Sequence, residues 1–206
     1  MTPTPGWPER CALVVIDVQN DYCDAQGTFG RAGARLDPIH AAVERIVHLV
    51  EVARRARVPV VWVKTEHDGW TNSPIWLDRR VRAVGGDICA TGSWGAEFFR
   101  VKPADDEVVV VKHRYSGFVG SRLPVVLRTL GRPTLVFCGV TTNVCVESTL
   151  RDAFMRDYQT LLVEDCAAAF TPAEHEAALH NVRTYFGQVI DSAALEDQWS
   201  SGPSRS

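Results

Sequence analysis

The chain has 206 residues, a formal net charge of −3 and 46% hydrophobic residues, which fits one ordinary globular domain with a sizeable core. It has no long block of like charge and no apolar run of membrane-spanning length, and Met1 to Pro8 lacks the basic and apolar regions of a secretory signal. We therefore expect a single domain over residues 1–206, with neither nucleic acid nor membrane as a partner.

The first half of the chain alternates apolar runs with helical patterns. The run Ala12 to Asp17 predicts a buried strand, and Val58 to Val63 predicts a second one. Between them, Asp37 is placed to cap a helix that has Pro38 at its first position. The apolar face of that helix is expected to consist of Ile39, Val43, Ile46, Val50 and Ala53.

The segment from Thr65 to Asp106 is too long to be structureless inside a compact domain. Ser73 and Pro74 precede a helical pattern from Ile75 to Val84, so we expect a short capped helix within it. The run Glu107 to Lys112 then predicts a third strand.

The second half continues the same alternation, which indicates an α/β fold built of parallel βαβ units. A capping box, Thr171 to Glu174, with proline at the first helical position marks the start of the last long helix. The polar tail, Ser200 to Ser206, is expected to be disordered. The expected elements are a helix from Ser121 to Leu130 stopped by Gly131, a strand Thr134–Gly139, a helix Val146–Tyr158, a strand Gln159–Val163 ending in Glu164 and Asp165, a helix from the capping box to about Phe186, and a strand Gln188–Ile190.

Three of these strands end in residues that can carry chemistry. Asp17 and Lys112 each end an apolar strand, and Cys145 follows the strand Thr134–Gly139 on the first turn of a helix. Residues at the carboxyl ends of parallel strands gather around one crevice. The N–H groups of a first helical turn also stabilise a thiolate. The sequence therefore predicts that a base, a cation and a nucleophile converge.

Each of the three has a simpler interpretation. Cys145 could be a buried helix thiol, and Asp17 could cap a helix or only form an ion pair with Lys112. The six cysteines of the chain show no CxxC pair and no disulfide-like spacing, which indicates free thiols and a reducing compartment, most simply the cytoplasm. Cys138, inside an apolar strand, is expected to be an inert buried residue.

These residues together carry a resemblance to a known family. Asp17 at a strand end, Lys112 before Tyr115-Ser116-Gly117-Phe118, and the run from Gly139 to Cys145 resemble the isochorismatase-like cysteine hydrolases, from about Ala12 to Ser192. Within that superfamily the chain is most similar to the branch of ureidoacrylate amidohydrolases and N-carbamoylsarcosine amidases. The resemblance implies a three-layer α/β/α fold around a six-stranded, mostly parallel sheet.

The resemblance also implies roles for the strand-end residues. Cys145 would be the nucleophile, Asp17 the base, and Lys112 the cation that orients Asp17 and favours the thiolate. The family carries a cis peptide bond at the position of Val140 and Thr141. In that geometry the backbone N–H groups of Thr141 and Cys145 would form an oxyanion hole.

Further residues are candidates for contact with the substrate. Asn20 lies just past the first strand, although an Asx turn would explain it equally well. Aromatic rings on the predicted loops could stack on a planar amide or ureide, or could be ordinary packing. The substrate-binding candidates are Asn20, His67, Trp76, Trp94, Tyr115 and Phe118.

His67 also raises the possibility of a metal site, since the related nicotinamidases bind zinc through one Asp and two His. This chain has no Asp-x-His between the first strand and the first helix, so we expect no metal. It also lacks GxGxxG, GxxxxGK[ST] and GxSxG, which disfavours nucleotide binding and serine hydrolysis. No cofactor is expected.

The prediction is a cysteine-dependent amidohydrolase that cleaves a C–N bond of a small ureide, carbamoyl or amide compound through a thioester intermediate. Its partners would be a small-molecule substrate and further copies of the chain, as a homo-oligomer (dimer or tetramer). The enzymatic alternative is vinyl-ether hydrolysis of the isochorismatase type, which uses the acid and needs no thiol. The alternative from another class is a non-catalytic thiol sensor or partner subunit.

Overall fold

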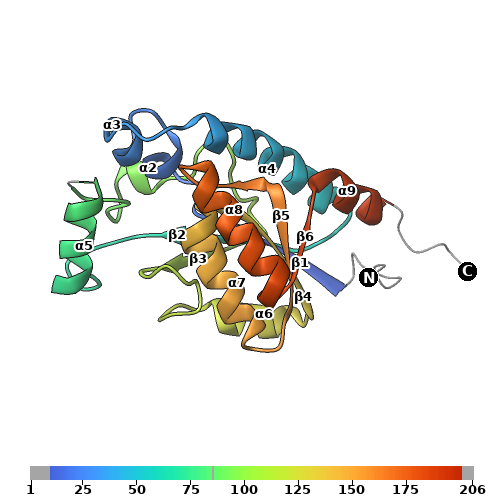
Figure 1. Cartoon of the computed structure of the whole chain (residues 1–206). Coiled ribbons are helices and arrows are strands. Elements are labelled where there is room, and N and C mark those ends of the chain that lie inside the picture. The colour runs from blue at the N-terminus through green and yellow to red at the C-terminus, as the bar shows by residue number, and fades with distance from the viewer. Residues whose placement is uncertain (1–9, 85, 201–206) are drawn as a thin grey trace, which may run out of the picture.

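Six parallel strands form the central layer of the structure, in the order β3-β2-β1-β4-β5-β6 (Figure 1). The computed structural model describes residues 10–84 and 86–200. The predicted α/β fold is confirmed, and every strand pair of the described sheet is parallel. The strands are β1 (Cys11–Ile16), β2 (Val60–Thr65), β3 (Val108–Lys112), β4 (Thr134–Val140), β5 (Gln159–Ala168) and β6 (Gln188–Ile190).

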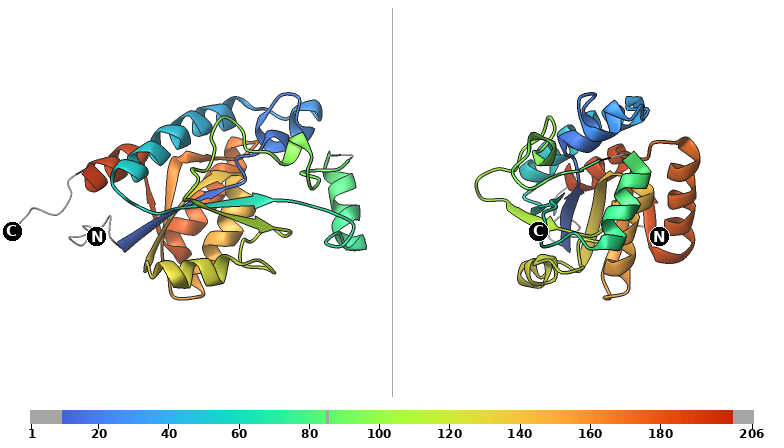
Figure 2. Two further views of the ribbon diagram at one scale, coloured as in Figure 1. Left: turned by 180° about the vertical axis from the view of Figure 1, so that it is seen from behind. Right: turned by 90° about the vertical axis from the view of Figure 1, so that its left-hand side faces the viewer.

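Helices cover both faces of this sheet and complete the three layers (Figure 2). One face carries α4 (Asp37–Arg55) and α9 (Ser192–Ser200). The other face carries α6 (Leu123–Leu130), the π-helical turn η2 (Thr142–Val146), α7 (Glu147–Phe154), α8 (Pro172–Asn181) and the π-helical turn η3 (Val182–Phe186).

The strand sequences explain why both faces are covered. Along β1, Leu13 and Val15 belong to the core under α4, whereas Ala12 and Val14 belong to the core under α6 and α7. Successive strand side chains point to opposite faces, so a continuous apolar run needs a helix layer on each side.

The remaining short helices lie around the carboxyl ends of the strands. They are α2 (Asn20–Cys23), α3 (Thr28–Arg31), α5 (Pro74–Val84) and η1 (Trp94–Ala96). In Figures 1 and 2, α5 stands out from the body of the molecule beyond the end of β2. The expected helix inside the segment Thr65 to Asp106 is therefore present.

Several predicted details are corrected. Asp37 is the first residue of α4 and Leu36 is its N-cap, without a side-chain cap hydrogen bond. β5 continues past Val163 to Ala168, because Cys166, Ala167 and Ala168 are buried against neighbouring elements. The helix that carries Cys145 runs from Thr142 through η2 and α7 to Phe154, earlier at both ends than predicted.

The carboxyl-terminal part of the chain holds a helix that the sequence pattern did not predict. Leu195 and Trp199 of α9 are both buried against the layer formed by α4. Ser200 ends this helix, and residues 201–206 of the predicted tail lie outside the described residues. Within the described ranges, no helix has the length and apolar character needed to cross a membrane.

Candidate active site

The structure brings Asp17, Lys112 and Cys145 together at the carboxyl end of the sheet. The Lys112 ammonium lies 2.8 Å from Asp17 Oδ2 and donates a hydrogen bond of 3.4 Å to Cys145 Sγ. The side chains of Asp17 and Lys112 are 0% and 1% exposed. A charged pair this deeply buried is tolerated only when both groups are paired and hydrogen-bonded, and here they also contact a thiol.

Thr65, the last residue of β2, completes this cluster. Its hydroxyl accepts a hydrogen bond of 2.6 Å from Lys112 Nζ and donates one of 3.0 Å to Asp17 Oδ1. The fully buried Gln19 holds Thr65 in place, since its side-chain amide pairs with the Thr65 N–H and C=O at 2.8 Å each. Neighbouring strand ends therefore fix the orientation of the Asp17 carboxylate.

The backbone at Asp17 adopts an uncommon conformation. Its φ angle is 53°, in the left-handed region that non-glycine residues rarely occupy, and its N–H bonds the Val63 carbonyl at 2.8 Å. A strained backbone persists only where the surrounding contacts offset its cost. Residues in this conformation are often found at functional sites.

Gly139 allows β4 to approach β1 closely just before the segment that carries Cys145. Its φ is 127°, and a Cβ atom at this position would lie 2.0 Å from the Ile16 carbonyl oxygen. Only glycine fits such a contact. The next residues, Val140 and Thr141, are joined by the predicted cis peptide bond.

The turn η2 then carries Cys145 as its fourth residue. This turn is connected to α8, because the Thr142 hydroxyl and His175 Nδ1 share a hydrogen bond of 2.9 Å. Burial lowers the pKa of His175, so its ring is neutral at neutral pH. The segment that carries Cys145 is thus held by both β4 and α8.

Burial also controls the two ionisable groups beside Asp17. It raises the pKa of the Cys145 thiol well above its usual value, the Asp17 carboxylate raises it further, and the Lys112 ammonium lowers it in part. For Lys112, burial alone lowers the pKa, but the charges of Asp17 and Cys145 outweigh burial and leave it raised. Both raised pKa values favour the protonated forms, a thiol on Cys145 and an ammonium on Lys112.

A cavity of about 230 Å³ opens onto this cluster. Thr65, Lys112, Thr141 and Cys145 line its inner part. Its remaining polar and aromatic lining includes His67, Trp76, Arg79, Arg114, Tyr115 and Glu174. Sites that bury drug-sized ligands measure roughly 300–1,000 Å³, so this one suits a compound of few atoms.

A wider groove of about 860 Å³ lies at the opposite ends of the strands, where Val60 begins β2 and Val108 begins β3. The described residues that line it include no Cys, His or Lys. Because this groove lies at the end of the sheet opposite the buried thiol, the smaller cavity is the candidate active site.

Three of the six substrate-binding candidates line the cavity, namely His67, Trp76 and Tyr115. The Trp76 ring lies between the other two, with centroid distances of 4.7 Å to Tyr115 and 5.7 Å to His67. Their contact with a substrate stays a prediction.

The other three candidates are absent from the lining of this cavity. Asn20 is buried and donates a 2.8 Å hydrogen bond to the Trp94 carbonyl. Trp94 is 47% exposed, and Phe118 packs in the core beside Leu123. In the described structure these three residues connect or support loops instead of facing the cavity.

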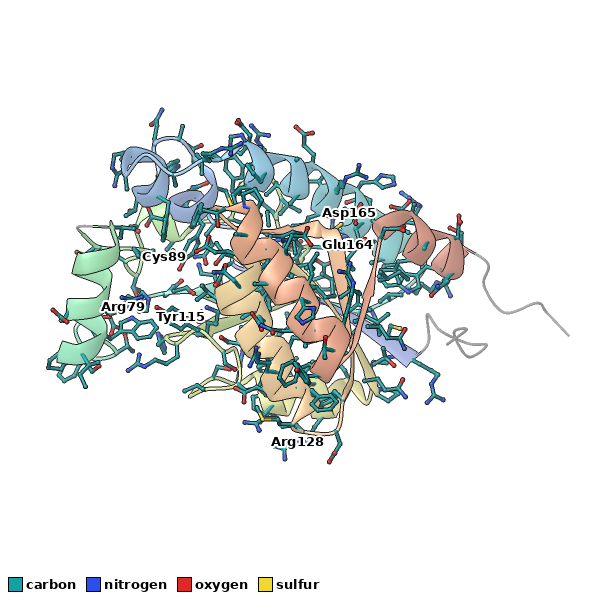
Figure 3. All side chains as sticks on the ribbon, in the orientation of Figure 1. Arg79, Cys89, Tyr115, Arg128, Glu164 and Asp165 are labelled. Carbon is teal, nitrogen blue, oxygen red and sulfur yellow. The ribbon has the colours of Figure 1, made fainter. Side chains whose placement is uncertain are left out.

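Arg79, Arg114 and Glu174 also line the cavity, although sequence reasoning had not singled them out. Arg114 lies two residues after Lys112, which was a usable signal, whereas Arg79 reaches the cavity only because of how α5 is placed. Figure 3 shows Arg79 on the side of α5 that faces the body of the protein, close to Tyr115.

No three His, Cys, Asp or Glu side chains within the described ranges are grouped so that they could hold a metal ion. The absence of a cofactor stays a prediction. The six cysteines are all free and buried.

The chain is similar in sequence to a known family of hydrolases. A family model described as the isochorismatase domain matches residues 11–194. The ureidoacrylate amidohydrolase RutB of Methylobacterium radiotolerans is 39% identical over 204 residues, covering 92% of this chain and 79% of that protein. RutB of Acinetobacter baylyi is 34% identical over 206 residues, covering 91% of this chain and 83% of that protein.

Solved structures show the same fold. A cysteine hydrolase from Pseudomonas syringae superposes with a TM-score of 0.85 at 28% identity, covering 98% of this chain and 97% of that chain. N-carbamoylsarcosine amidase from Thermoplasma acidophilum superposes with a TM-score of 0.71 at 30% identity, covering 89% and 96% of the two chains. The chain is therefore similar to hydrolases over nearly its whole length.

Proposed function

Since the chain belongs to the isochorismatase family of hydrolases, we propose that it is a cysteine-dependent amidohydrolase that cleaves a C–N bond of a small ureido or carbamoyl acid. One observation carries the proposal. A single buried ammonium, Lys112, contacts both a carboxylate and a thiol at the inner end of a small cavity.

In the first half of the reaction, Asp17 takes the proton of the Cys145 thiol and the sulfur attacks the substrate carbonyl. Lys112 compensates the negative charge in both states, because it contacts both side chains. The N–H groups of Thr141 and Cys145 donate to the oxyanion of the tetrahedral intermediate. The C–N bond then breaks, and Asp17 returns its proton to the leaving nitrogen.

The second half releases the acyl group from sulfur. The intermediate is a thioester, or a thiocarbamate when the substrate is a ureide. Water attacks its carbonyl while Asp17 accepts a proton, and the C–S bond breaks to restore the thiol. A terminal ureide thereby yields ammonia and a carbamate, which can decompose to an amine and carbon dioxide.

Two observations support this substrate class, namely the names of the relatives and the size and lining of the cavity. The relatives' names describe a ureido group on acrylate and a carbamoyl group on sarcosine, and both compounds join a planar C–N carbonyl unit to a carboxylate. The cavity of about 230 Å³ fits molecules of this size, and Trp76 and Tyr115 supply rings for a planar group.

Replacement of the nucleophile tests the proposal. Cys145→Ser should fold normally and release ammonia from ureidoacrylate about 1,000-fold or more slowly, because a hydroxyl at this site is too weakly acidic to be ionised. Ureidoacrylate, its simple amide analogue and nicotinamide are compared by kcat/KM, with ureidoacrylate expected to be the best substrate.

Cys89→Ser is the matched control. Cys89 is also a buried thiol, and its sulfur lies 3.7 Å from the Gly95 carbonyl, a hydrogen bond that a hydroxyl can replace. Near-normal ammonia release by Cys145→Ser would exclude the thiol mechanism. Failure of the unchanged protein to release ammonia from any of the three compounds, with cleavage of a vinyl ether such as isochorismate, would favour the alternative with Asp17 as the acid. Preference for nicotinamide would refute the substrate class while leaving the mechanism intact.

A further inference from the structure

The cavity carries two guanidinium groups that are not neutralised by a carboxylate. Arg79 on α5 and Arg114 after β3 both line it, and within the described parts of the chain neither forms an ion pair with Asp or Glu. The acidic residue of the lining, Glu174, accepts a hydrogen bond from the Thr171 hydroxyl at 2.8 Å. The third cation, Lys112, is already paired with Asp17.

Arg114 is held in one orientation by its surroundings. Its guanidinium donates to the carbonyl oxygens of Thr71 at 2.9 Å and His113 at 2.6 Å. The same group lies 5.0 Å from the centre of the Trp76 ring, and Tyr115 packs on that ring at 4.7 Å. A guanidinium fixed by carbonyls and stacked on an aromatic ring loses little further freedom when it binds a planar anion.

Trp76 contributes a second donor. Its indole Nε1 is buried and has no hydrogen-bond partner among the described residues, although the ring lines the cavity. A buried N–H without an acceptor is unfavourable, and a ligand in the cavity could supply that acceptor. The cavity thus offers a positive charge and an N–H donor on adjacent side chains.

We propose that Trp76, Arg79 and Arg114 form an anion subsite that binds the carboxylate of the substrate while the ureide carbonyl lies at Cys145. Arg114 is the principal group, because a guanidinium fork matches a carboxylate in geometry and charge. Arg79 is exposed on α5 and adds charge from the side of the cavity that this helix covers. The inference rests on the proposed function for the reacting half of the substrate, and it assigns the residues that would bind the acid group and so reject neutral ureides.

Arg114→Gln tests the principal group. It should lower kcat/KM for ureidoacrylate by about 100-fold, whereas kcat/KM for the neutral primary amide of the same compound should change by less than about 3-fold. Arg114→Lys, which keeps the charge but not the fork, should give an intermediate loss. Arg156→Gln is the matched control, because Arg156 stacks on Phe118 at 4.9 Å and lies outside this cavity.

Trp76→Phe tests the indole donor while it keeps an aromatic ring beneath Arg114. Turnover of ureidoacrylate should fall by about 10-fold and that of the amide should hardly change. Trp94→Phe, at an exposed loop tryptophan outside the cavity lining, should affect neither substrate. Thermal unfolding of every variant checks that the fold is intact.

Two results would overturn the subsite. One is an equal loss for the acid and the amide in Arg114→Gln, which would make Arg114 a support for the loop. The other is a wild-type protein that hydrolyses the amide as well as the acid.

Calorimetric binding of ureidoacrylate to Cys145→Ala, with and without Arg114→Gln, separates this inference from the proposed function. If no ureide is hydrolysed but the acid binds at least about 10-fold more weakly without Arg114, the subsite stands and the proposed reaction fails. If hydrolysis proceeds but removal of Arg114 leaves acid binding unchanged, the reaction stands and the subsite fails.

Discussion

Lys112 is the residue that links the two reactive groups of the proposed mechanism. It is buried between an acid and a thiol and contacts both of them. The Asp17 charge raises the pKa of Cys145 and the Lys112 charge lowers it, in addition to the larger effect of burial. Removal of the Asp17 charge should therefore make the thiol more reactive, and removal of the Lys112 charge should make it less reactive.

Asp17→Asn tests the effect of the Asp17 charge on the thiol separately from the role of Asp17 as a base. Hydrolysis should fall by about 1,000-fold, because the base is lost. Alkylation of Cys145 by iodoacetamide near pH 8 should become faster, because loss of the carboxylate charge lowers the pKa of the thiol while Lys112 remains to pair with the thiolate. The measurement is the alkylation rate against pH, followed at Cys145 by mass spectrometry.

In the unchanged protein the alkylation rate should still be rising above the ordinary thiol pKa, because the pKa of Cys145 is raised. Glu164→Gln removes a carboxylate that pairs with Arg183 instead of Lys112 and should leave the profile unchanged. Slower alkylation of Asp17→Asn would mean that Asp17 favours the thiolate by orienting Lys112, and that its charge matters less than this positioning.

At the scale of elements, one largely buried carboxylate joins the start of β3 to β2 and α4. Glu107 accepts hydrogen bonds from Trp62 Nε1 at 2.7 Å, from the Ala104 N–H at 2.9 Å and from Arg54 Nε at 2.9 Å. Burial by itself raises the pKa of Glu107, but these hydrogen bonds and the Arg54 charge outweigh it and leave the pKa below its usual 4.5. The ionised form is thus stabilised by folding.

Glu107→Gln should lower the free energy of unfolding by about 2 kcal/mol at pH 7, since it weakens several charge-assisted hydrogen bonds of a largely buried group. A lowered folded-state pKa contributes stability above the unfolded-state value, and this contribution disappears as the pH falls through the folded-state value. The difference between the two proteins in urea unfolding should therefore shrink below about pH 4.

Glu44→Gln is the control for that measurement. Glu44 is 73% exposed and its nearest cation, on Arg100, is 3.9 Å away, so its loss should change stability by less than about 0.5 kcal/mol. A Glu107 effect that persisted unchanged at acid pH would show that packing of the side chain, and not its charge, joins these elements.

The sequence predicted the long elements because their patterns are local. The apolar face of α4 and the capping box of α8 can be read from a few adjacent residues, and the structure has Ile39, Val43 and Ile46 buried and the Thr171 hydroxyl accepting from the Glu174 N–H. The helix α9 was missed because its stability depends on packing against α4, which no local pattern records.

The same distinction explains what was predicted of the site. Asp17, Lys112 and Cys145 mark strand and helix ends, so their convergence followed from the parallel fold. Thr65 ends a strand too, but its role depends on pairing with Gln19 and Lys112 across the chain. Arg79 reaches the cavity because the loops on both sides of α5 place this helix beside it. The sequence pattern does not determine how those loops fold.

At the scale of the whole molecule, the sheet order brings β1, β2, β3 and β4 side by side, so that four strand ends supply one site from residues far apart in sequence. In this arrangement the positive charge beside Asp17 is supplied by a lysine side chain. Asp17 is neutralised by Lys112, and no three potential ligands gather elsewhere in the described chain. Both the fold and the reaction should then be independent of divalent metals.

Dialysis against a chelator tests this independence with two readouts. The kcat for ureidoacrylate should change by less than about 2-fold, and Tm should stay within about 1 °C, because a metal that is bound only by the folded protein would otherwise contribute to its stability. The control is the same dialysed protein after addition of zinc, manganese or iron. If dialysis abolished activity or lowered Tm, and one metal restored the loss, His67 and partners of the cavity would have to be reconsidered as ligands. Loss of activity that no metal restores, with Tm unchanged, would point instead to oxidation of the buried thiol at Cys145, which a reductant reverses.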